Sequence, residues 1–366
     1  MKIVIAPDSF KDCLTAIEVA SAIEKGFKRI LPNEEYIKLP ISTHRSDIIQ
    51  SLVFATNGQN ISHQVVDLVG DKIQGTYGLS EDDHIAFIDT TLSNLNKLTP
   101  HKSTTSMGVG QQIKDALDKG VKRIVLIINE DIVNDGGIGA LQALGMQLID
   151  HQGMNIPFEN QELINLCRID TRFMHPHLKN VTFDLVVNDD AAVNMNENPF
   201  QSQNIPDEKE IESSINNNLV NFSHIIKKQF GNPIIVKENS AENFMAGLAS
   251  ILNTNQSSII DIFSEMFKLD KHIKTASLVI TGQGELSPFT EHELIHNVVN
   301  LSKKYDTSIV AITGCIPAND NVIDDSGIEA IFSITPRPVE LSVALDEAKI
   351  NIEQTSKSIA SLITML

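Results

Sequence analysis

Short, continuous apolar runs recur along the chain, and longer amphipathic segments separate them. The runs lie at 2–6, 123–128, 184–187, 277–281 and 308–313. Apolar runs bounded by polar residues are typical of strands that are buried on both faces of a parallel sheet. The segments between them predict helices at 108–117, 137–144, 242–252 and 342–363. This alternation of strands and helices predicts an α/β fold.

Three further segments refine this pattern. Thr15 and Glu18 have the spacing of a capping box, and the apolar residues that follow recur with helical spacing to residue 27, which predicts a helix there. Residues 61–91 show the alternation and tight turns of antiparallel strands. The stretch 150–230 is polar and rich in Asn and Gln, which predicts long surface loops.

Composition excludes several classes of function. The chain has 366 residues, a formal net charge of −18 and no tryptophan. A strongly acidic surface repels nucleic acid and anionic membranes, so neither is an expected partner. No apolar run approaches the roughly 20 residues of a membrane span, and the N-terminus is typical of a strand rather than a signal peptide. Three widely spaced cysteines favour a reducing, cytoplasmic location.

One glycine-rich turn is a candidate for chemistry. The stretch VNDGGIGALQALG, residues 133–145, follows the apolar run at 123–128 and opens a predicted helix. Ligands of α/β proteins commonly bind beyond the carboxyl ends of parallel strands. This turn is therefore an expected part of a binding site.

Several segments, in this order, resemble the bacterial glycerate kinase family, which phosphorylates D-glycerate with ATP. They are IAPDSFKDCLTAIEVASAIEKGF (5–27), TTSMGVGQQIKDALDKG (104–120), VNDGGIGALQALG (133–145), ASLVITGQGEL (276–286) and FSITPRP (332–338). The resemblance implies one flavodoxin-like or Rossmann-like domain, a second α/β domain inserted into it, and an active site between them. We expect residues 1–60 with 285–366 to form the first domain and residues 61–284 the inserted one.

The same resemblance implies a set of site residues for ATP, Mg²⁺ and a small-molecule substrate. Lys11 would neutralise phosphate or substrate charge, Asp8 would hold a substrate hydroxyl or a magnesium-bound water, and Asp135 would bind Mg²⁺ or accept the hydroxyl proton. The full expected set is Asp8, Lys11, Asn134 and Asp135 as catalytic residues, with one of Asp189 or Asp190, and Ser9, Gly136, Gly137, Gly282 and Gly284 for the nucleotide.

Other polar positions depart from the family pattern. Asn129-Glu130-Asp131 stands where the family has glycines and a serine, 42–47 replaces an acidic glycine-rich motif, and Gln283 and Glu285 replace an acid and an arginine. Phosphoryl transfer depends on positioned charge, so such losses are costly. Our first hypothesis is a catalytically degenerate paralogue that binds a small-molecule ligand or a protein partner. The alternative is an active ATP-dependent glycerate 2-kinase.

A third hypothesis comes from HELIH, residues 292–296. On a helix, His292 and His296 share one face and could bind Zn²⁺, with Glu293 activating a water. A third ligand would have to come from Asp320, Asp324 or Asp325. An ordinary solvated helix start explains the same residues without a metal.

Overall fold

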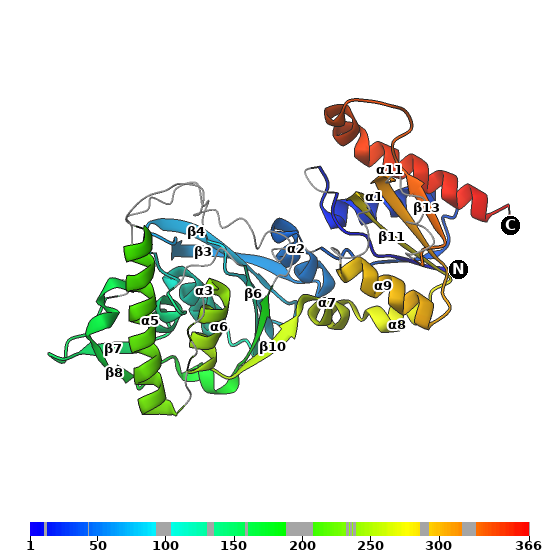
Figure 1. Ribbon diagram of the computed structural model, residues 1–366. Coiled ribbons are helices and arrows are strands. Elements are labelled where there is room, and N and C mark those ends of the chain that lie inside the picture. The colour runs from blue at the N-terminus through cyan, green and yellow to red at the C-terminus, as the bar shows by residue number, and fades with distance from the viewer. Residues whose placement is uncertain are drawn as a thin grey trace. The chain divides into compact units, whose positions relative to one another are not determined.

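A computed structural model divides the chain into two compact units (Figure 1). Unit 1 contains Met1–Thr56 and Ile259–Leu366, and unit 2 contains Asn57–Ser258. The sequence of unit 2 is therefore inserted into that of unit 1. The structure describes residues 1–10, 13–42, 44–92, 104–129, 135–157, 160–187, 208–231, 234, 236, 239–285, 293–316 and 327–365.

Unit 1 is built on a five-stranded sheet in which every pairing is parallel. Its strands are β1 (Lys2–Ile5), β2 (Glu35–Lys38), β11 (Leu278–Glu285), β12 (Ile309–Cys315) and β13 (Ala330–Ser333), in the order β13-β12-β11-β1-β2. The sequence analysis assigns residues up to 284 to the inserted domain. Residues 259–284 belong to unit 1 instead, and within them β11 pairs with β1 in the sheet of that unit.

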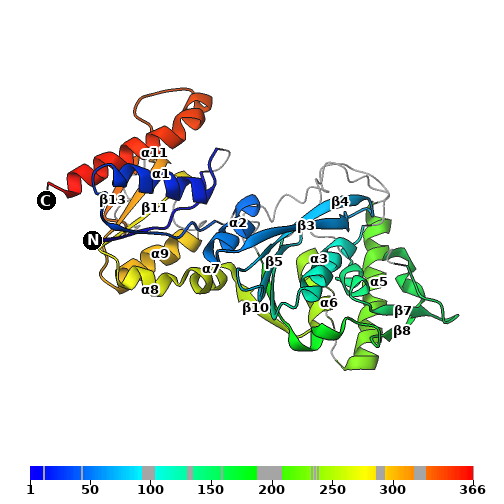
Figure 2. The ribbon, with the colours of Figure 1, turned by 180° about the vertical axis from the view of Figure 1, so that it is seen from behind.

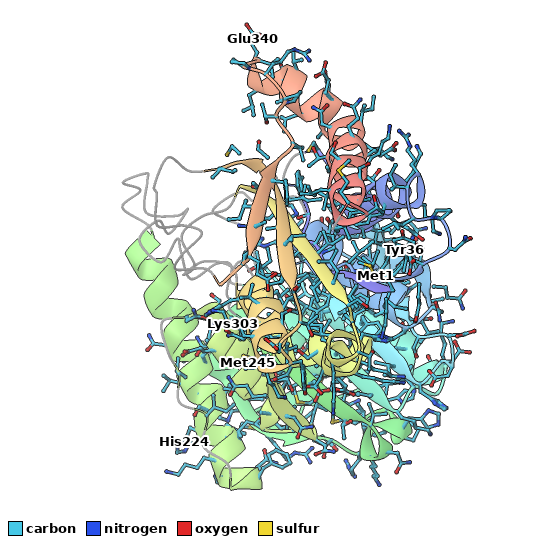
Figure 3. The ribbon with its side chains drawn as sticks, turned by 90° about the vertical axis from the view of Figure 1, so that its right-hand side faces the viewer. Met1, Tyr36, His224, Met245, Lys303 and Glu340 are labelled. Carbon is cyan, nitrogen blue, oxygen red and sulfur yellow. The ribbon has the colours of Figure 1, made fainter. Side chains whose placement is uncertain are left out.

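Helices cover both faces of this sheet. They are α1 (Ala16–Lys28), α2 (Arg45–Ala55), α7 (Ile259–Phe267), α8 (Leu269–Lys274), α9 (Glu293–Lys304) and α11 (Leu341–Ile363). Helices α1 and α11 lie side by side on one face, and α8 and α9 lie on the other (Figures 1 and 2). Tyr36 of β2, labelled in Figure 3, packs against the core under α1 and α11.

The start of α1 confirms the predicted capping box. The Thr15 hydroxyl accepts the Glu18 N–H at 3.2 Å, and the Glu18 carboxylate accepts the Thr15 N–H at 3.1 Å. These reciprocal bonds satisfy N–H groups that have no partner within the first turn of a helix. At the other end, Lys25 and Arg29 both pair with Glu353 of α11, at 2.7 and 2.8 Å.

Unit 2 contains a six-stranded mixed sheet. Its strands are β3 (Gln59–Val66), β4 (Lys72–Leu79), β5 (Ile85–Asp89), β6 (Arg123–Ile128), β9 (Thr182–Val187) and β10 (Thr254–Ser258), in the order β10-β9-β6-β5-β4-β3. The pairs β3–β4 and β4–β5 are antiparallel, which confirms the prediction for 61–91. The pairs β5–β6, β6–β9 and β9–β10 are parallel.

The helices of unit 2 confirm three predictions and correct one. Helices α3 (Met107–Asp118), α4 (Ile138–Ala143) and α6 (Ser240–Ala249) begin and end within three residues of the predicted bounds. The expectation of long loops over 150–230 is wrong, because α5 (Glu208–Phe230) lies there. Its buried Leu219, Phe222 and Ile226 have helical spacing, which the surrounding asparagines obscure. Figure 3 marks α5 at His224 and α6 at Met245.

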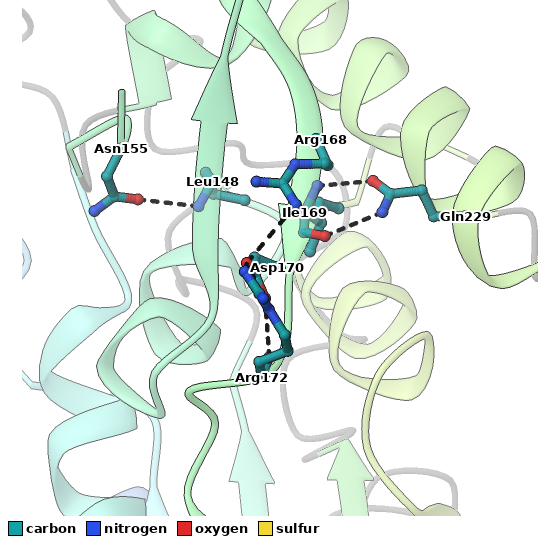
Figure 4. Close-up of polar contacts among 7 residues, drawn as sticks. All are labelled: Leu148, Asn155, Arg168, Ile169, Asp170, Arg172 and Gln229. Atoms are coloured by element: carbon teal, nitrogen blue, oxygen red, sulfur yellow. Dashed lines mark hydrogen bonds and ion pairs between the residues drawn. The ribbon is translucent and has the colours of Figure 1, made fainter. Parts of the chain in front are cut away.

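A small hairpin projects from unit 2, again within the stretch expected to be loops. It pairs β7 (Gln147–Asp150) with β8 (Leu166–Asp170), and a side-chain amide bonds to the outer edge of each strand (Figure 4). Gln229 of α5 accepts the Ile169 N–H at 2.7 Å and donates to the Ile169 carbonyl at 3.0 Å. Asn155 accepts the Leu148 N–H at 3.1 Å. The Gln229 amide thus replaces a neighbouring strand beside β8, whereas the backbone of 154–156 also bonds to β7, with the Ile156 N–H donating to the Leu148 carbonyl at 2.7 Å.

Within the described ranges, no helix has the length and apolar character needed to cross a bilayer. The three cysteines, Cys13, Cys167 and Cys315, are free thiols.

An ion pair closes the end of β8 (Figure 4). The Arg172 Nε donates to the two carboxylate oxygens of Asp170, at 2.9 and 3.1 Å. This pairing holds the pKa of the Asp170 carboxyl at about 2, below its ordinary value. Since the folded-state pKa is lowered, the ionised carboxylate stabilises the fold above about pH 4, and that stabilisation is lost as the pH falls towards 2.

We therefore expect Asp170→Asn to lower the midpoint of urea unfolding at pH 6, with a difference from wild type that narrows between about pH 4 and pH 2. The control is Asp71→Asn, which changes an exposed aspartate of the same unit. A difference between wild type and Asp170→Asn that stays constant across this pH range would contradict the assignment.

Candidate functional site

The sheet of unit 1 changes direction between β1 and β11. From β1 the chain crosses through α1 to β2 on one side, and from β11 it crosses through α9 to β12 on the other. A crevice forms at such a switch point, outside the carboxyl ends of the two central strands. Asp8 and Ser9 follow β1 at this edge, and Gly282 and Gly284 lie at the end of β11.

The Asp8 side chain is fixed in its orientation. The backbone N–H of Asp8 donates to the Gly282 carbonyl at 2.8 Å, which attaches this residue to β11. The Ser9 N–H and hydroxyl both donate to one Asp8 carboxylate oxygen, at 2.5 and 3.1 Å. Asp8 and Ser9 keep only 4% and 7% of their surface exposed. The structure therefore brings Asp8, Ser9 and Gly282 together, as the sequence analysis expects.

The glycines at the end of β11 allow close contact with β12. A Cβ atom on Gly282 would lie 2.0 Å from the Ile312 carbonyl oxygen, and one on Gly314 would lie 2.4 Å from the Gly284 oxygen. Any side chain at these positions would force the two strands apart. Strand packing thus gives Gly282 and Gly314 a structural reason that does not depend on a nucleotide.

In unit 2, the Asp135 carboxylate organises the glycine turn. It accepts the Ser106 N–H and the Ser106 hydroxyl, each at 2.8 Å, the Gly137 N–H at 2.9 Å and the Gly139 N–H at 3.1 Å. The Ser106 hydroxyl accepts the Ala140 N–H in turn, at 2.9 Å. This network joins the residue before α3 to the first turn of α4.

Two features of the environment of Asp135 shift its pKa in opposite directions. Burial raises the pKa of this carboxyl above its ordinary value, and the hydrogen bonds from Ser106, Gly139 and Gly137 act in the opposite direction. Because all four donors lie within the fold, the geometry favours a positioning role for Asp135. Its expected role as a magnesium ligand or proton acceptor stays a prediction.

Gly136 and Gly137 meet two requirements of this turn. Both have left-handed backbones, with φ of 63° and 72°, which favour glycine. A Cβ atom on Gly136 would also lie 2.7 Å from the Leu219 side chain of α5. The left-handed backbone therefore favours glycine at both positions, and a side chain at Gly136 would also displace Leu219.

A second polar network lies at the carboxyl end of β5 and β6. The Asn129 amide donates to the Asp89 carboxylate at 2.8 Å and to the Thr91 hydroxyl at 3.0 Å. The Thr91 N–H donates to the same Asp89 oxygen at 2.7 Å, and the Asn129 N–H donates to the Thr90 hydroxyl at 3.3 Å. Asn129 is 1% exposed, so a buried amide fixes the orientation of the Asp89 carboxylate.

The sequence analysis does not identify Asp89, Thr90 or Thr91 as site residues. It treats all strands in 61–91 as antiparallel to their neighbours. An antiparallel pair places the carboxyl ends of its two strands at opposite edges of the sheet, so Asp89 is not expected beside the end of another strand. The sequence feature that could have identified Asp89 is the apolar run that precedes it, which is typical of a strand in a parallel sheet. Strand β5 pairs with β4 on one side and in parallel with β6 on the other. Parallel pairing brings Asp89 beside Asn129.

Several expected residues lie outside the described part of the chain. They are Lys11, Asn134, Asp189, Asp190 and His292, with the three possible further zinc ligands Asp320, Asp324 and Asp325. His296 is described and lies exposed on α9. Among the described residues, no group of three His, Cys, Asp or Glu side chains is arranged to hold a metal ion.

Comparisons with known proteins add to this geometry. Residues 3–364 match the model of the glycerate kinase family. The chain is 34% identical to the glycerate kinase of Haemophilus influenzae over 99% of both proteins, and 33% identical to the glycerate 2-kinase of Escherichia coli over 100% of this chain and 98% of that protein. A crystal structure described as glycerate kinase 2 of Salmonella typhimurium matches with a TM-score of 0.80 and 29% identity, over 100% of this chain and 98% of that one.

The Asp135 network leads to a prediction about stability. Replacing Asp135 with Ala leaves three N–H groups and a hydroxyl without their acceptor, so we expect the free energy of unfolding to fall by at least about 2 kcal/mol. Urea unfolding followed by circular dichroism measures the change. Asp71→Ala, at an exposed aspartate of the same unit, should change it by less than about 0.5 kcal/mol. Equal effects of the two substitutions would show that the network does not stabilise the turn.

Proposed function

Because this chain belongs to the glycerate kinase family, we propose that it is an active ATP-dependent kinase that phosphorylates glycerate. The observation that carries the proposal is the match from end to end. Relatives named as glycerate kinases align over 98–100% of this chain, with comparable cover of their own length. A family member that no longer catalysed the reaction would also be expected to lose parts of the chain that active relatives keep.

This proposal reverses the order of our sequence hypotheses. The departures from the family's polar motifs favour a degenerate paralogue. In the described residues, however, each unit retains an oriented aspartate at the C-terminal ends of its parallel strands. Asp8 is held by Ser9, and Asp89 is held by Asn129 and Thr91. Ordered carboxylates at the ends of parallel strands support a working site.

The proposed reaction needs little covalent chemistry from the protein. A glycerate hydroxyl oxygen attacks the γ-phosphorus of ATP, the bond to the β–γ bridging oxygen breaks, and ADP leaves. The hydroxyl proton passes to a carboxylate or to water. Catalysis then depends on positioning and on stabilising the charge of the transferring phosphoryl group.

Mg²⁺ accompanies ATP in such reactions, where it neutralises charge on the phosphates. It binds through one or two carboxylates while keeping several waters. Asp8 and Asp89 are carboxylates of the required kind, and each is oriented by neighbouring donors. We propose that Asp8 in unit 1 and Asp89 in unit 2 each serve, within their own unit, to hold Mg²⁺ or to orient the glycerate hydroxyl.

The direct test is glycerate-dependent formation of ADP from Mg²⁺–ATP, with the phosphorylated position identified by ³¹P NMR. We expect turnover with D-glycerate, and we expect Asp8→Asn to lower kcat/KM by about 10²-fold, because it removes a charge while keeping the side chain's shape. The matched control Asp346→Asn changes an exposed aspartate of α11 in the same unit and should leave kcat/KM unchanged. Folded protein without glycerate-dependent turnover would restore the degenerate paralogue as the better hypothesis.

The Asn129 network is tested separately. Asn129→Ala removes two donors that orient Asp89 and Thr91, so we expect kcat/KM to fall by about 10-fold or more. Asn221→Ala is the matched control, because Asn221 also uses its amide to hold the backbone of unit 2, at the Leu163 and Leu166 carbonyls. The control should lose stability but keep its activity. Similar activity in both variants would remove Asp89 and Asn129 from the proposed site.

A further inference from the structure

A cavity of about 290 Å³ lies within unit 2, beside the hairpin of β7 and β8. Its lining comes from the first residue of α3, from the end of α4 and the segment that leads into β7, and from the loops at 155–157 and 173. An apolar cavity of about 150 Å³ can hold one benzene ring. The larger volume here therefore suits a small molecule of one or two rings.

The apolar part of the lining favours an aromatic ligand. Met107 and Met146 both line the cavity, together with Phe173. Thioether sulfurs make favourable contacts with aromatic rings, and aromatic side chains pair with other rings in stacked or edge-on arrangements. Phe173 keeps 61% of its surface exposed, so a bound ring would cover an aromatic side chain that the fold leaves exposed.

The polar part of the lining consists of side-chain amides. Gln142, Gln147 and Asn155 line the cavity, and none of the described lining residues carries a charge. Phosphates and carboxylates are bound most strongly by charged donors such as Arg and Lys. The lining therefore suits a neutral ligand, and the anionic reactants of the proposed phosphoryl transfer do not match it.

One of these amides has an unused hydrogen-bond acceptor. The Gln142 Nε2 donates to the Ile156 carbonyl at 3.0 Å. The Gln142 Oε1 is buried, and nothing in the described ranges donates to it. A buried oxygen without a donor is unfavourable. Because the same side chain lines the cavity, a ligand with an N–H or O–H group can supply the missing donor.

Backbone contacts form the cavity before any ligand binds. The Ile156 N–H donates to the Leu148 carbonyl at 2.7 Å, which fixes one loop against β7. Gly145 has a left-handed backbone with φ of 102°, and a Cβ atom there would lie 2.1 Å from the Phe173 carbonyl oxygen. The glycine thus lets the two segments meet closely. A site that is already formed loses less free energy to ordering when it binds.

We propose that this cavity binds a small, neutral aromatic compound that carries an N–H or O–H donor. The ring packs against Met107, Met146 and Phe173, and the donor bonds to the Gln142 Oε1. The ligand contacts α3 and α4, the two helices that the Asp135 network joins. Binding to the folded form is therefore expected to raise the midpoint of urea unfolding.

The first experiment uses indole and 1-methylindole, which share a ring system but differ in the N–H donor. By isothermal titration calorimetry, we expect wild type to bind indole saturably and 1-methylindole about 10-fold more weakly. Gln142→Met removes the acceptor and should bind the two probes equally. The matched control Gln147→Met removes the other glutamine of the lining and should keep the 10-fold difference.

A second pair of variants tests the aromatic wall. We expect Phe173→Ala to weaken indole binding by about 10-fold, because it removes the exposed ring. Ile164→Ala is the matched control, since Ile164 is 59% exposed in the same unit and does not line the cavity. Its affinity for indole should equal that of wild type. Circular dichroism checks that each variant is folded.

The position of the probe is measured by NMR of ¹³C-methyl methionine. We expect indole to shift the methyl signals of Met107 and Met146 and to leave that of Met365, which is 80% exposed in unit 1, unchanged. Absence of indole binding would overturn the proposal. So would equal affinity of wild type for the two probes, equal affinity of Phe173→Ala and Ile164→Ala, or shifts confined to other methionines.

Discussion

The buried carboxylate of Asp135 is the constraint on which the glycine turn of unit 2 depends. One aspartate satisfies donors from the residue before α3 and from the first turn of α4, so two helices that follow different strands are fixed relative to each other. The left-handed Gly136 and Gly137 allow the chain to turn tightly enough for this. The turn that resembles a ligand-binding loop therefore fixes α3 and α4 relative to each other.

The same principle holds in unit 1 with different groups. Close backbone contact between β11 and β12, allowed by Gly282 and Gly314, fixes the strand to which the Asp8 N–H is bonded. In both units the sequence uses glycine for packing and leaves oriented carboxylates at the ends of parallel strands. For the proposed kinase, this means that positions which resemble nucleotide contacts also support the residues beside them.

Sequence patterns predict the central strands β1, β6, β9, β11 and β12 and the start of α1, because apolar runs and capping residues act locally. They do not predict β2, β10 or β13. They do not predict α5, because its buried Leu219, Phe222 and Ile226 stand among asparagines. They also place 259–284 in the inserted domain rather than in unit 1, since only long-range contacts such as the pairing of β11 with β1 show where that segment belongs. Asp8 and Ser9 are predicted from a motif, whereas Asp89 depends on parallel pairing with a distant strand, which no local pattern records.

The central claim is that the two carboxyl edges bind the reactants of a phosphoryl transfer. Amide hydrogen exchange, measured with Mg²⁺–ATP alone, with D-glycerate alone and with both, tests it directly. The account predicts slower exchange in peptides that cover 6–10 and 279–285 of unit 1 and 87–92 and 127–129 of unit 2. Unchanged exchange in all of these peptides, or protection confined to other parts of the chain, would contradict it.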